Sequence, residues 1–370
     1  MQKKIAVLPG DGIGPEITAE AVKCLKAVAL KFGHSFDFEY GLIGASAIDN
    51  CGNPYPYSTH ELCMGSNAVL FGAIGDPKYD NDPSAKIRPE QGLLQMRREL
   101  GLFANIRPVE LFPSLVERSP LKASIIAGAD LVVVRELTGG IYFGEPRGRS
   151  ESGERAFDTC TYSVAEIERI TRVAFEIAAK RNRPSPKVTL VDKANVLATS
   201  RLWREVVTNI HRDHFPGIGL EFMFVDNAAM QLVTSPAKFD VILTENMFGD
   251  ILSDEAGVLT GSIGLLPSAS TGSLVSLFEP IHGSYPQAAG LNIANPLATI
   301  LSASMMLQIA FSMEKEAALL KRCCTAAIED GVVTSDLGGT HSTSQVGDYI
   351  ASKVMGSYLA LVSSGLAASL

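Results

Sequence analysis

Residues 245–255 have the sequence ENMFGDILSDE and follow a short apolar run, FDVILT, at residues 239–244. The apolar run predicts a buried strand, and the segment after it predicts a helix that begins near Phe248. In that helix Asp250 and Asp254 stand four residues apart on one face, where two like charges repel each other. A cation or a basic side chain would offset the repulsion, and Mg²⁺ or Mn²⁺ prefer hard oxygen ligands of this kind. For this segment in isolation, two solvated carboxylates on a surface helix would be the preferred explanation.

The length and composition of the chain limit the classes of protein to which it can belong. With 370 residues it is longer than one hydrophobic core usually allows, so two domains are expected. The hydrophobic fraction of 46% and the charged fraction of 19% are those of an ordinary soluble globular protein. A net charge of −8 argues against nucleic acid or an anionic membrane as the main partner. An anionic substrate would therefore need a local basic cluster.

Cysteine usage and hydropathy indicate where the protein works. The six cysteines are scattered and form no Cys-x-x-Cys pair, which predicts reduced thiols and a cytoplasmic protein. The apolar stretch Ile5 to Leu8 is too short for a signal peptide. Two long stretches without charge, 256–278 and 280–313, contain Pro, Gly, Asn or His, and residues 297–311 resemble a buried helix. We therefore expect no membrane segment.

Several further apolar runs predict buried strands, and ionisable or glycine-rich residues follow them. The runs lie at residues 3–8, 67–75, 131–134, 188–191 and 221–225. Arg135, Lys193, Asp226 and Asp250 all fall at or just beyond the carboxyl end of a predicted strand. In α/β proteins ligands bind outside the carboxyl ends of the strands. The pattern predicts an α/β protein with one shared site at that edge.

The turn after the first strand, residues 9–16 (PGDGIGPE), is rich in glycine. It is not the dinucleotide-binding fingerprint, because the third glycine would have to fall at Pro15. Pro15 instead suits the N1 position of a helix. Such a turn can receive the polar groups of a ligand, and a purely structural turn explains it equally well.

Two other segments have a clear pattern. Residues 90–100 (EQGLLQMRREL) predict a helix that places Glu90, Leu93, Leu94 and Arg97 on one face. Residues 144–157 are polar and contain glycine, which predicts an exposed arm or loop. Ser163 to Glu166 forms a capping box that opens a helix running to about residue 181.

Five stretches, taken together, resemble the isocitrate/isopropylmalate dehydrogenase family of β-decarboxylating hydroxyacid dehydrogenases. They lie in collinear order over nearly the whole chain: residues 9–16 (PGDGIGPE), 135–142 (RELTGGIY), 191–197 (VDKANVL), 246–255 (NMFGDILSDE) and 279–284 (EPIHGS). The resemblance implies the two-domain α/β fold of that family, which is not a Rossmann fold. Residues 1–102 with 261–370 would form the first domain, on the adenosine side of the cofactor site. Residues 103–260 would form the second, with the metal ligands, a dimer interface and an arm near 144–157.

The reaction that the resemblance implies is the oxidative decarboxylation of (2R,3S)-3-isopropylmalate to 4-methyl-2-oxopentanoate with reduction of NAD, in leucine biosynthesis. The enzyme would be a homodimer with active sites shared between subunits. Mg²⁺ or Mn²⁺, held by Asp226, Asp250 and Asp254, would chelate the substrate hydroxyl and a carboxylate and stabilise the enolate. Lys193 would act as the general base and Tyr142 as the acid that protonates the carbon left after CO₂ departs.

The implied substrate-binding residues combine positive charge with an apolar wall. They are Leu93, Leu94, Arg97, Arg107, Arg135, Asn195 and Asp226. The planar forks of the arginines suit the two carboxylates of a malate-type substrate. Leu93 and Leu94 suit an isopropyl group and would reject the distal carboxylate of isocitrate. The alternative is that these leucines belong to the hydrophobic core.

The implied cofactor-binding residues include one departure from the family pattern. They are Ile13, Pro77, Glu90, His282, Gly283, Ser284, Gln287 and Asn295. Family members that use NAD usually have an aspartate for the adenosine ribose where this chain has Gln287. Relatives that use NADP carry basic residues nearby, and residues 285–289 (YPQAA) contain none. NAD is therefore the expected cofactor.

Three alternatives stay open on the sequence alone. A tartrate or homoisocitrate dehydrogenase of the same family would share most of the motifs. A Mg²⁺-dependent phosphoryl-transfer enzyme using the turn at Gly10–Gly14 would explain the carboxylates but not Leu93 and Leu94. A ligand-binding protein without catalysis is the third.

Overall fold

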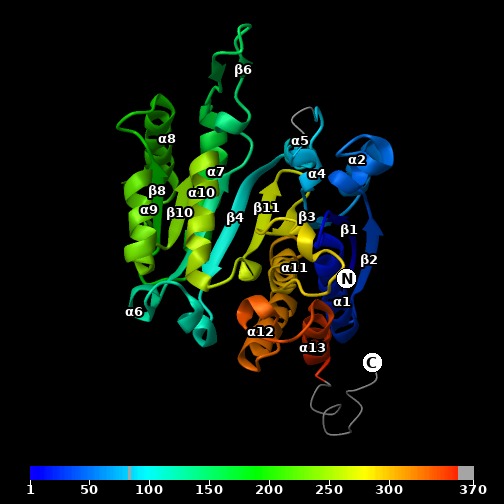
Figure 1. Cartoon of the computed structure of the whole chain (residues 1–370). Helices are drawn as coiled ribbons and strands as arrows, with labels where there is room; N and C mark the ends of the chain where they lie inside the picture. Colours follow the sequence, from blue (N-terminus) through cyan, green and yellow to red (C-terminus); the bar gives the residue numbers. More distant parts are fainter. Residues whose placement is uncertain (82–84, 357–370) are drawn as a thin grey trace, which may run out of the picture. The chain divides into compact units, whose positions relative to one another are not determined.

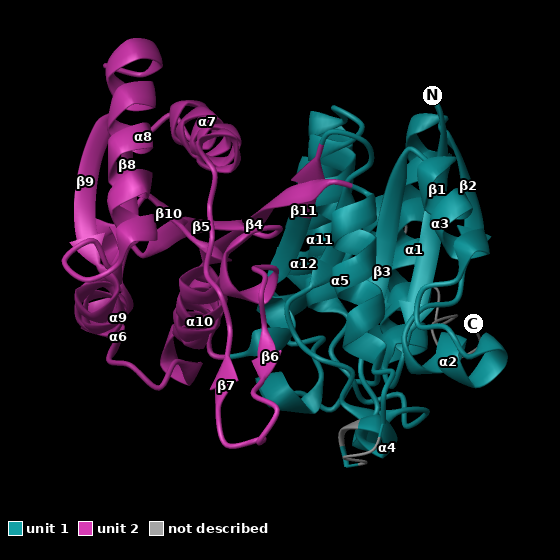
Figure 2. Cartoon of the chain, turned by 90° about the horizontal axis from the view of Figure 1, so that it is seen from above, with its two compact units in different colours: residues 1–100, 262–269, 273–370 teal, residues 101–261, 270–272 magenta. Residues whose placement is uncertain are grey.

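The chain is a mixed α/β protein, and its computed structural model describes residues 1–81 and 85–356 (Figure 1). It divides into two compact units, coloured separately in Figure 2. Unit 1 comprises Met1–Leu100, Ser262–Ala269 and Ser273–Leu370, and unit 2 comprises Gly101–Gly261 and Ser270–Gly272. The predicted α/β class is confirmed. Residues 357–370, which the first predicted domain includes, lie outside the described residues.

Unit 1 combines a parallel set of strands with helices from both ends of the chain. Its elements are β1 (Gln2–Gly10), α1 (Gly14–Phe32), β2 (Ser35–Tyr40), α2 (Ala45–Cys51), α3 (Tyr57–Met64), β3 (Ala68–Ala73), α4 (Pro77–Asp80), α5 (Pro89–Glu99), η5 (Ile263–Leu265), β12 (Leu277–Pro280), η6 (Pro286–Ala288), α11 (Leu297–Ile309), α12 (Glu314–Glu329), η7 (Ser335–Leu337) and α13 (Thr343–Met355). The strands follow the order β2-β1-β3-β12 with parallel pairing. All of β3 is buried, as expected of a parallel strand covered on both faces.

The glycine-rich turn between β1 and α1 has a structural explanation. The buried Asp11 carboxylate accepts hydrogen bonds from the backbone N–H groups of Ala45, Ser46 and Gly75, each at 2.9 Å. Gly10 has a φ of +72°, and a Cβ there would lie 1.9 Å from the Ala73 carbonyl oxygen. The turn therefore ties three segments of unit 1 together. Pro15 is the second residue of α1 rather than the first.

Unit 2 contains a set of mainly parallel strands and a separate short antiparallel pair, β6–β7. Its elements are β4 (Leu102–Glu110), η1 (Pro113–Arg118), α6 (Ala123–Ile126), β5 (Asp130–Glu136), η2 (Gly140–Tyr142), β6 (Gly148–Arg149), β7 (Ala156–Phe157), α7 (Val164–Lys180), β8 (Lys187–Asp192), α8 (Ala198–His214), β9 (Gly219–Phe224), α9 (Val225–Thr234), η3 (Pro236–Lys238), β10 (Val241–Thr244), α10 (Asn246–Gly257) and η4 (Val258–Thr260). The order is β4-β5-β10-β8-β9, and only the β4–β5 pair of these is antiparallel. The strand β11 (Pro267–Gly272) begins in unit 1 and ends in unit 2.

Two hydrophobic cores lie on opposite faces of the unit 2 strands. Val132 and Val134 belong to a core shared with α7 and α8, whereas Leu131 and Val133 belong to a second core shared with α9 and α10. Successive side chains of a strand point to opposite faces, so both faces of β5 are buried. This double burial explains why β5, β8 and β10 are apolar along most of their length. The run predicted as a buried strand at residues 221–225 differs, because β9 is the last strand of the sheet and most of its residues are exposed or half-buried.

Most of the predicted elements are present with small shifts at their ends. The capping box at Ser163 is formed in both directions and opens α7. The helix that carries the two aspartates begins at Asn246 instead of near Phe248, because the Glu245 side chain accepts a hydrogen bond from the Phe248 N–H and caps it. Residues 144–157 form a largely exposed arm that contains the short β6–β7 pair. No helix among the described residues is long and apolar enough to cross a membrane.

Candidate active site

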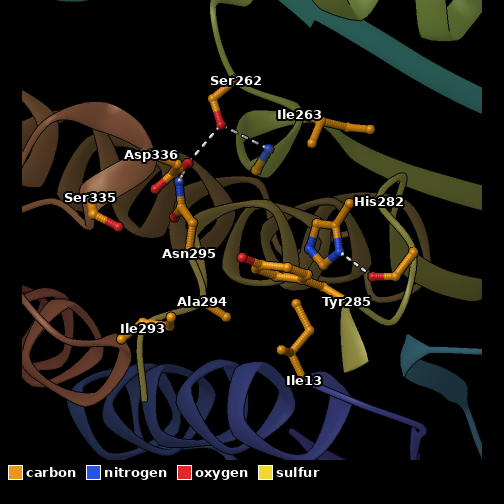
Figure 3. Close-up of a pocket in the computed structure, with 12 residues that line it drawn as sticks. Ile13, Ser262, Ile263, His282, Tyr285, Ile293, Ala294, Asn295, Ser335 and Asp336 are labelled. Carbon is orange, nitrogen blue, oxygen red and sulfur yellow. Dashed lines mark hydrogen bonds between the residues drawn. The ribbon is translucent and has the colours of Figure 1, made fainter. Parts of the chain in front are cut away.

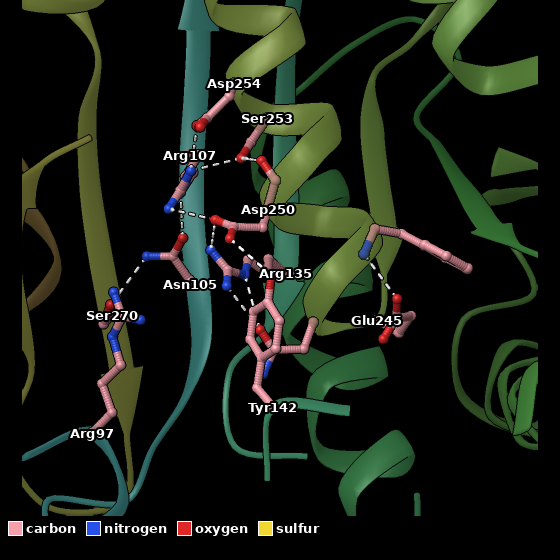
Figure 4. Close-up of polar contacts among 12 residues, drawn as sticks. Arg97, Asn105, Arg107, Arg135, Tyr142, Glu245, Asp250, Ser253, Asp254 and Ser270 are labelled. Carbon is pink, nitrogen blue, oxygen red and sulfur yellow. Dashed lines mark hydrogen bonds and ion pairs between the residues drawn. The ribbon is translucent and has the colours of Figure 1, made fainter. Parts of the chain in front are cut away.

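Five of the predicted residues, from β4, the end of β5, η2 and α10, form one polar cluster in unit 2 (Figure 4). Arg135 at the end of β5 donates to Asp250, and the Tyr142 hydroxyl donates to the same carboxylate at 3.2 Å. Arg107 on β4 donates to Asp254 at 3.0 Å and lies 3.7 Å from Asp250. We call these residues, Arg107, Arg135, Tyr142, Asp250 and Asp254, the arginine–aspartate cluster.

The cluster balances charge between buried cations and partly exposed anions. The side chains of Arg107 and Arg135 are 8% and 3% exposed, while those of Asp250 and Asp254 are 37% and 58% exposed. The repulsion expected between the two aspartates is therefore offset by two guanidinium groups. Partial burial raises the pKa of Asp254, Arg107 opposes that shift, and the neighbouring Asp250 carboxylate adds to it. Both carboxylates keep an open side from which a ligand can approach.

Tyr142 lies in η2 and is half-buried. Burial, and then the Asp250 carboxylate, raise the pKa of its hydroxyl above the ordinary value. The group therefore keeps its proton at neutral pH and can donate it.

Lys193 and Asp226 form a second, separate group in unit 2. Lys193 follows β8 and its Nζ lies 2.9 Å from Asp226 Oδ2, in the first turn of α9. This hydrogen bond lowers the pKa of Asp226. The backbone N–H of Lys193 donates to Ser200 Oγ at 3.1 Å. Asn195, which is predicted to bind substrate, is exposed. Among residues 1–81 and 85–356 of one chain, no three His, Cys, Asp or Glu side chains are placed to hold a metal ion together.

Unit 1 carries the remaining predicted substrate residues on α5. Arg97 is buried, and its Nη2 lies 3.3 Å from Glu279 Oε1. Its Nε is buried without a hydrogen-bond partner, which leaves one directional donor for a ligand. Leu93 and Leu94 are half-buried on the same helix and are not core residues. Arg97, Arg107 and Arg135 are called the clamp arginines below.

A cavity of about 540 Å³ in unit 1 contains half of the predicted cofactor residues (Figure 3). Its walls are Ile13, Ser262, Ile263, Gly264, His282, Gly283, Tyr285, Ile293, Ala294, Asn295, Ser335 and Asp336. Branched and aromatic side chains supply flat apolar surface, and a few polar groups converge on it, as is usual for small-molecule sites. None of the described residues that line the cavity is a Lys or an Arg.

Asp336 and His282 are the carboxylate and the imidazole among the described residues that line this cavity. Asp336 Oδ2 accepts hydrogen bonds from Ser262 Oγ at 2.7 Å and from Asn295 Nδ2 at 3.0 Å. His282 Nδ1 lies 2.9 Å from the Gly283 carbonyl oxygen, and its Nε2 is buried without a partner. Burial lowers the pKa of His282, and the Gly283 carbonyl opposes that shift. The imidazole is thus neutral, with Nδ1 donating and Nε2 free to accept from a ligand.

The other predicted cofactor residues lie elsewhere in unit 1. Ser284 is buried, and its carbonyl oxygen accepts from the Ile13 N–H at 2.8 Å. Gln287 is exposed in η6 and does not line the cavity. Pro77 begins α4, and Glu90 is the second residue of α5.

Sequence reasoning missed several residues that the structure places at these sites. Asp336 lies 41 residues from Asn295 and no local motif marks it. Asn105 and Asn246 bind Arg107 and Arg135, but buried asparagines give no distinctive pattern in a sequence. The position of Arg135 at the end of a predicted strand indicated a site residue. Nothing in the sequence indicated that the Asn246 amide would orient its guanidinium group.

Comparisons with known proteins agree over nearly the whole chain. Residues 4–350 match the family described as isocitrate/isopropylmalate dehydrogenase. A protein of Bacteroides fragilis (strain YCH46) named 3-isopropylmalate dehydrogenase is 52% identical over 95% of this chain and 98% of its own. One of the same name from Geobacillus kaustophilus (strain HTA426) is 57% identical over 90% of each chain.

Solved structures give the same result for the fold. The isocitrate dehydrogenase of Methylococcus capsulatus matches 95% of this chain and 99% of its own, with a TM-score of 0.84 and 34% identity. A β-decarboxylating dehydrogenase of Thermococcus kodakarensis matches 98% of this chain and 97% of its own, with a TM-score of 0.78 and 35% identity.

Proposed function

The chain belongs to the isocitrate/isopropylmalate dehydrogenase family, and we propose that it oxidatively decarboxylates (2R,3S)-3-isopropylmalate to 4-methyl-2-oxopentanoate in leucine biosynthesis. The observation that carries this conclusion is the identity of 52% and 57% to relatives named 3-isopropylmalate dehydrogenase, over most of both chains. The family predicted from the motifs is confirmed. The tartrate, homoisocitrate and phosphoryl-transfer alternatives are not favoured.

The substrate is a dianion with a branched apolar substituent, and the described residues match both properties. The clamp arginines are guanidinium cations of the kind that binds carboxylates, and the Nε of Arg97 is a buried donor without a partner. Leu93 and Leu94 are half-buried, so each retains apolar surface for an isopropyl group. A carboxylate placed there would lose its hydration without gaining a partner.

The metal ligands we propose are Asp250 and Asp254 of one subunit and Asp226 of a second copy of the chain. Carboxylate oxygens suit Mg²⁺ or Mn²⁺, and all three side chains are at least partly exposed. The ion would act as a Lewis acid toward the substrate hydroxyl and the developing enolate. We propose the second copy because Asp226 is bound to Lys193, and no three potential ligands come together among the described residues of one chain.

Two side chains move the protons of the reaction. Lys193 Nζ takes the proton of the substrate hydroxyl while the alcohol is oxidised, and Asp226 holds the amine in place at 2.9 Å. The Tyr142 hydroxyl gives a proton to the carbon that has lost CO₂, and Asp250 fixes the direction of that hydroxyl. Each active site would therefore combine Tyr142 of one subunit with Lys193 of the other in a homodimer.

NAD is the cofactor we propose, with its adenosine in the unit 1 cavity. Ile13, Ile263 and Tyr285 offer apolar surface for a purine, and the neutral His282 offers a buried acceptor. The Asp336 carboxylate and the absence of Lys or Arg among the described lining residues disfavour the 2′-phosphate of NADP. All six cysteines are free thiols, in keeping with the cytoplasm as its compartment.

The purified protein should be assayed for NADH formation with isopropylmalate, isocitrate, homoisocitrate and tartrate in turn. Isopropylmalate should give the highest kcat/KM, with added Mg²⁺ or Mn²⁺ required after treatment with a chelator. A higher kcat/KM with any of the other three acids would overturn the substrate assignment. Turnover unaffected by the chelator would overturn the metal site.

A further inference from the structure

Each clamp arginine of unit 2 is bound at its Nε by a buried asparagine. Asn105 Oδ1 accepts from Arg107 Nε at 2.6 Å, and its Nδ2 donates to Ser270 Oγ at 3.0 Å. Asn246 Oδ1 accepts from Arg135 Nε at 3.1 Å and from Arg135 Nη2 at 2.8 Å. Both asparagine side chains are fully buried. The same chemical arrangement therefore occurs twice, on different elements.

An amide orients a guanidinium group without cancelling its charge. A carboxylate in the same place would accept the same hydrogen bonds but would also neutralise the cation. A neutral acceptor adds no negative charge to that of Asp250 and Asp254, with which Arg135 and Arg107 are already paired. Buried asparagines are thus the suitable partners for arginines that must receive the carboxylates of a substrate.

The two asparagines differ in what their amide nitrogens hold. Asn246 Nδ2 donates to the Gly139 carbonyl oxygen at 3.1 Å, and Gly139 directly precedes η2, which carries Tyr142. The Arg135 guanidinium also lies over the Tyr142 ring, 5.9 Å from its centroid. The amide nitrogen of Asn105 donates instead to Ser270 Oγ, on β11.

The backbone around Asn246 is itself held firmly. Its N–H donates to the Tyr162 hydroxyl at 3.0 Å, and that hydroxyl donates to Glu245 Oε2 at 3.0 Å. A Cβ on Gly140 would lie 2.3 Å from the Tyr162 hydroxyl, so η2 is packed closely against the same group. Little room is left for η2 to move while Asn246 is in place.

We propose that Asn246 is a positioning residue that sets the substrate clamp and the catalytic acid together. Its Oδ1 orients Arg135, and its Nδ2 holds Gly139 and thereby Tyr142. Asn105 orients Arg107, and its amide nitrogen is held by Ser270. The proposal rests on the proposed function, since it assigns Arg135 and Tyr142 the roles given above.

The test compares Asn246→Ala with Asn105→Ala in the full-length enzyme. Both substitutions should raise the KM for isopropylmalate, because each releases one clamp arginine. Asn246→Ala alone should also lower kcat, by about 10- to 100-fold, because a misplaced acid slows the chemical step. Equal effects of the two substitutions on kcat would overturn the proposal, as would wild-type KM and kcat in a folded Asn246→Ala enzyme.

A double-mutant cycle distinguishes positioning from general loss of structure. In a Tyr142→Phe background, Asn246→Ala should lower kcat no further, although it should still raise KM. A further fall in kcat equal to that in the wild-type background would show that Asn246 does not act through Tyr142.

If Asn246→Ala does not fold, the isosteric Asn246→Asp provides the same test. It keeps an acceptor for Arg135, cancels part of its charge and removes the donor to Gly139, so KM should rise and kcat should fall. Unchanged constants in that variant would overturn the proposal. A wild-type enzyme inactive on isopropylmalate would instead refute the proposed function.

Discussion

Lys193 Nζ lies 2.9 Å from Asp226 Oδ2, while the hydroxyl of Tyr142 is bound to Asp250, 3.2 Å away. The proposed base and the proposed acid of unit 2 thus have different aspartate partners.

If each active site takes one group from each of two subunits, Lys193→Met and Tyr142→Phe homodimers should both be nearly inactive. In a mixed dimer both lesions fall in one site and the other site is intact. Random re-assortment of equal amounts should restore activity to about a quarter of all sites.

Denaturing the two inactive proteins together, refolding them and measuring NADH formation tests this expectation. Each variant refolded alone is the control. No recovery in the mixture, with dimers formed, would mean that the acid and the base act within one chain.

The metal site can be tested at Asp250. Asp250→Asn removes a proposed metal ligand and weakens the partner of Arg135, so turnover with Mg²⁺ should fall by more than about 100-fold. The protein should still unfold cooperatively on heating, because the side chain is partly exposed and α10 keeps its apolar contacts. Near-normal turnover with Mg²⁺ would exclude Asp250 as a ligand.

Substrate choice should depend on Leu93. Leu93→Ser removes apolar surface from the proposed isopropyl wall, and kcat/KM for isopropylmalate should fall about 10-fold or more relative to malates with small or polar substituents. The matched control is Gln95→Ser, on the exposed side of the same helix. If the ranking of substrates is the same for both variants, Leu93 does not form the wall.

Cofactor choice should depend on charge near the unit 1 cavity. Asp336→Asn removes the carboxylate of the cavity wall, so the ratio of kcat/KM for NAD over NADP should fall. Gln287→Asp should raise that ratio if residue 287 faces the ribose. Gln287 is exposed and does not line the cavity. If Gln287→Asp leaves the ratio unchanged while Asp336→Asn lowers it, Asp336 and not residue 287 determines the preference for NAD over NADP.

Stability should fall on acidification because of His282. Burial lowers the pKa of this imidazole below its ordinary value of 6.5, so under mildly acidic conditions the unfolded chain binds a proton that the folded protein does not. The contribution of His282 to the free energy of unfolding is complete when the pH is above 6.5, the ordinary pKa of histidine. It is lost as the pH falls toward the lower pKa of His282 in the folded protein. Denaturant unfolding at neutral and mildly acidic pH should show a smaller loss for His282→Gln than for the wild type. Substituting the exposed His214 in the same way is the control.

Three strands of unit 2 were predictable because both of their faces are buried. β5, β8 and β10 are apolar runs, and the side chains that follow them lie at the shared carboxyl-terminal edge. The antiparallel direction of β4 was not predictable, since residues 102–110 contain polar and charged side chains that only the neighbouring segments explain.

The types of residue at the candidate site were predictable, but the pairs that these side chains form with one another were not. The family motifs contain Lys193, Asp250 and Asp254, and the resemblance implies Asp226 beside them. Spacing along the chain does not reveal that Lys193 binds Asp226 while Arg135 binds Asp250. Asp336 was missed for the same reason, because only folding brings it to Asn295.

The interruption of unit 1 by unit 2 has a consequence for synthesis on the ribosome. Nearly all of unit 2 is one continuous stretch, Gly101–Gly261, so it is available to fold before the rest of the chain has been made. β3, by contrast, must wait for β12, since Val69 pairs with Leu277 across the whole of that insertion. During that interval one edge of β3 has no hydrogen-bonded neighbour. The closure of so long a loop slows the pairing of β3 with β12. The growing chain is therefore most exposed to aggregation, and most dependent on chaperones, in its first hundred residues.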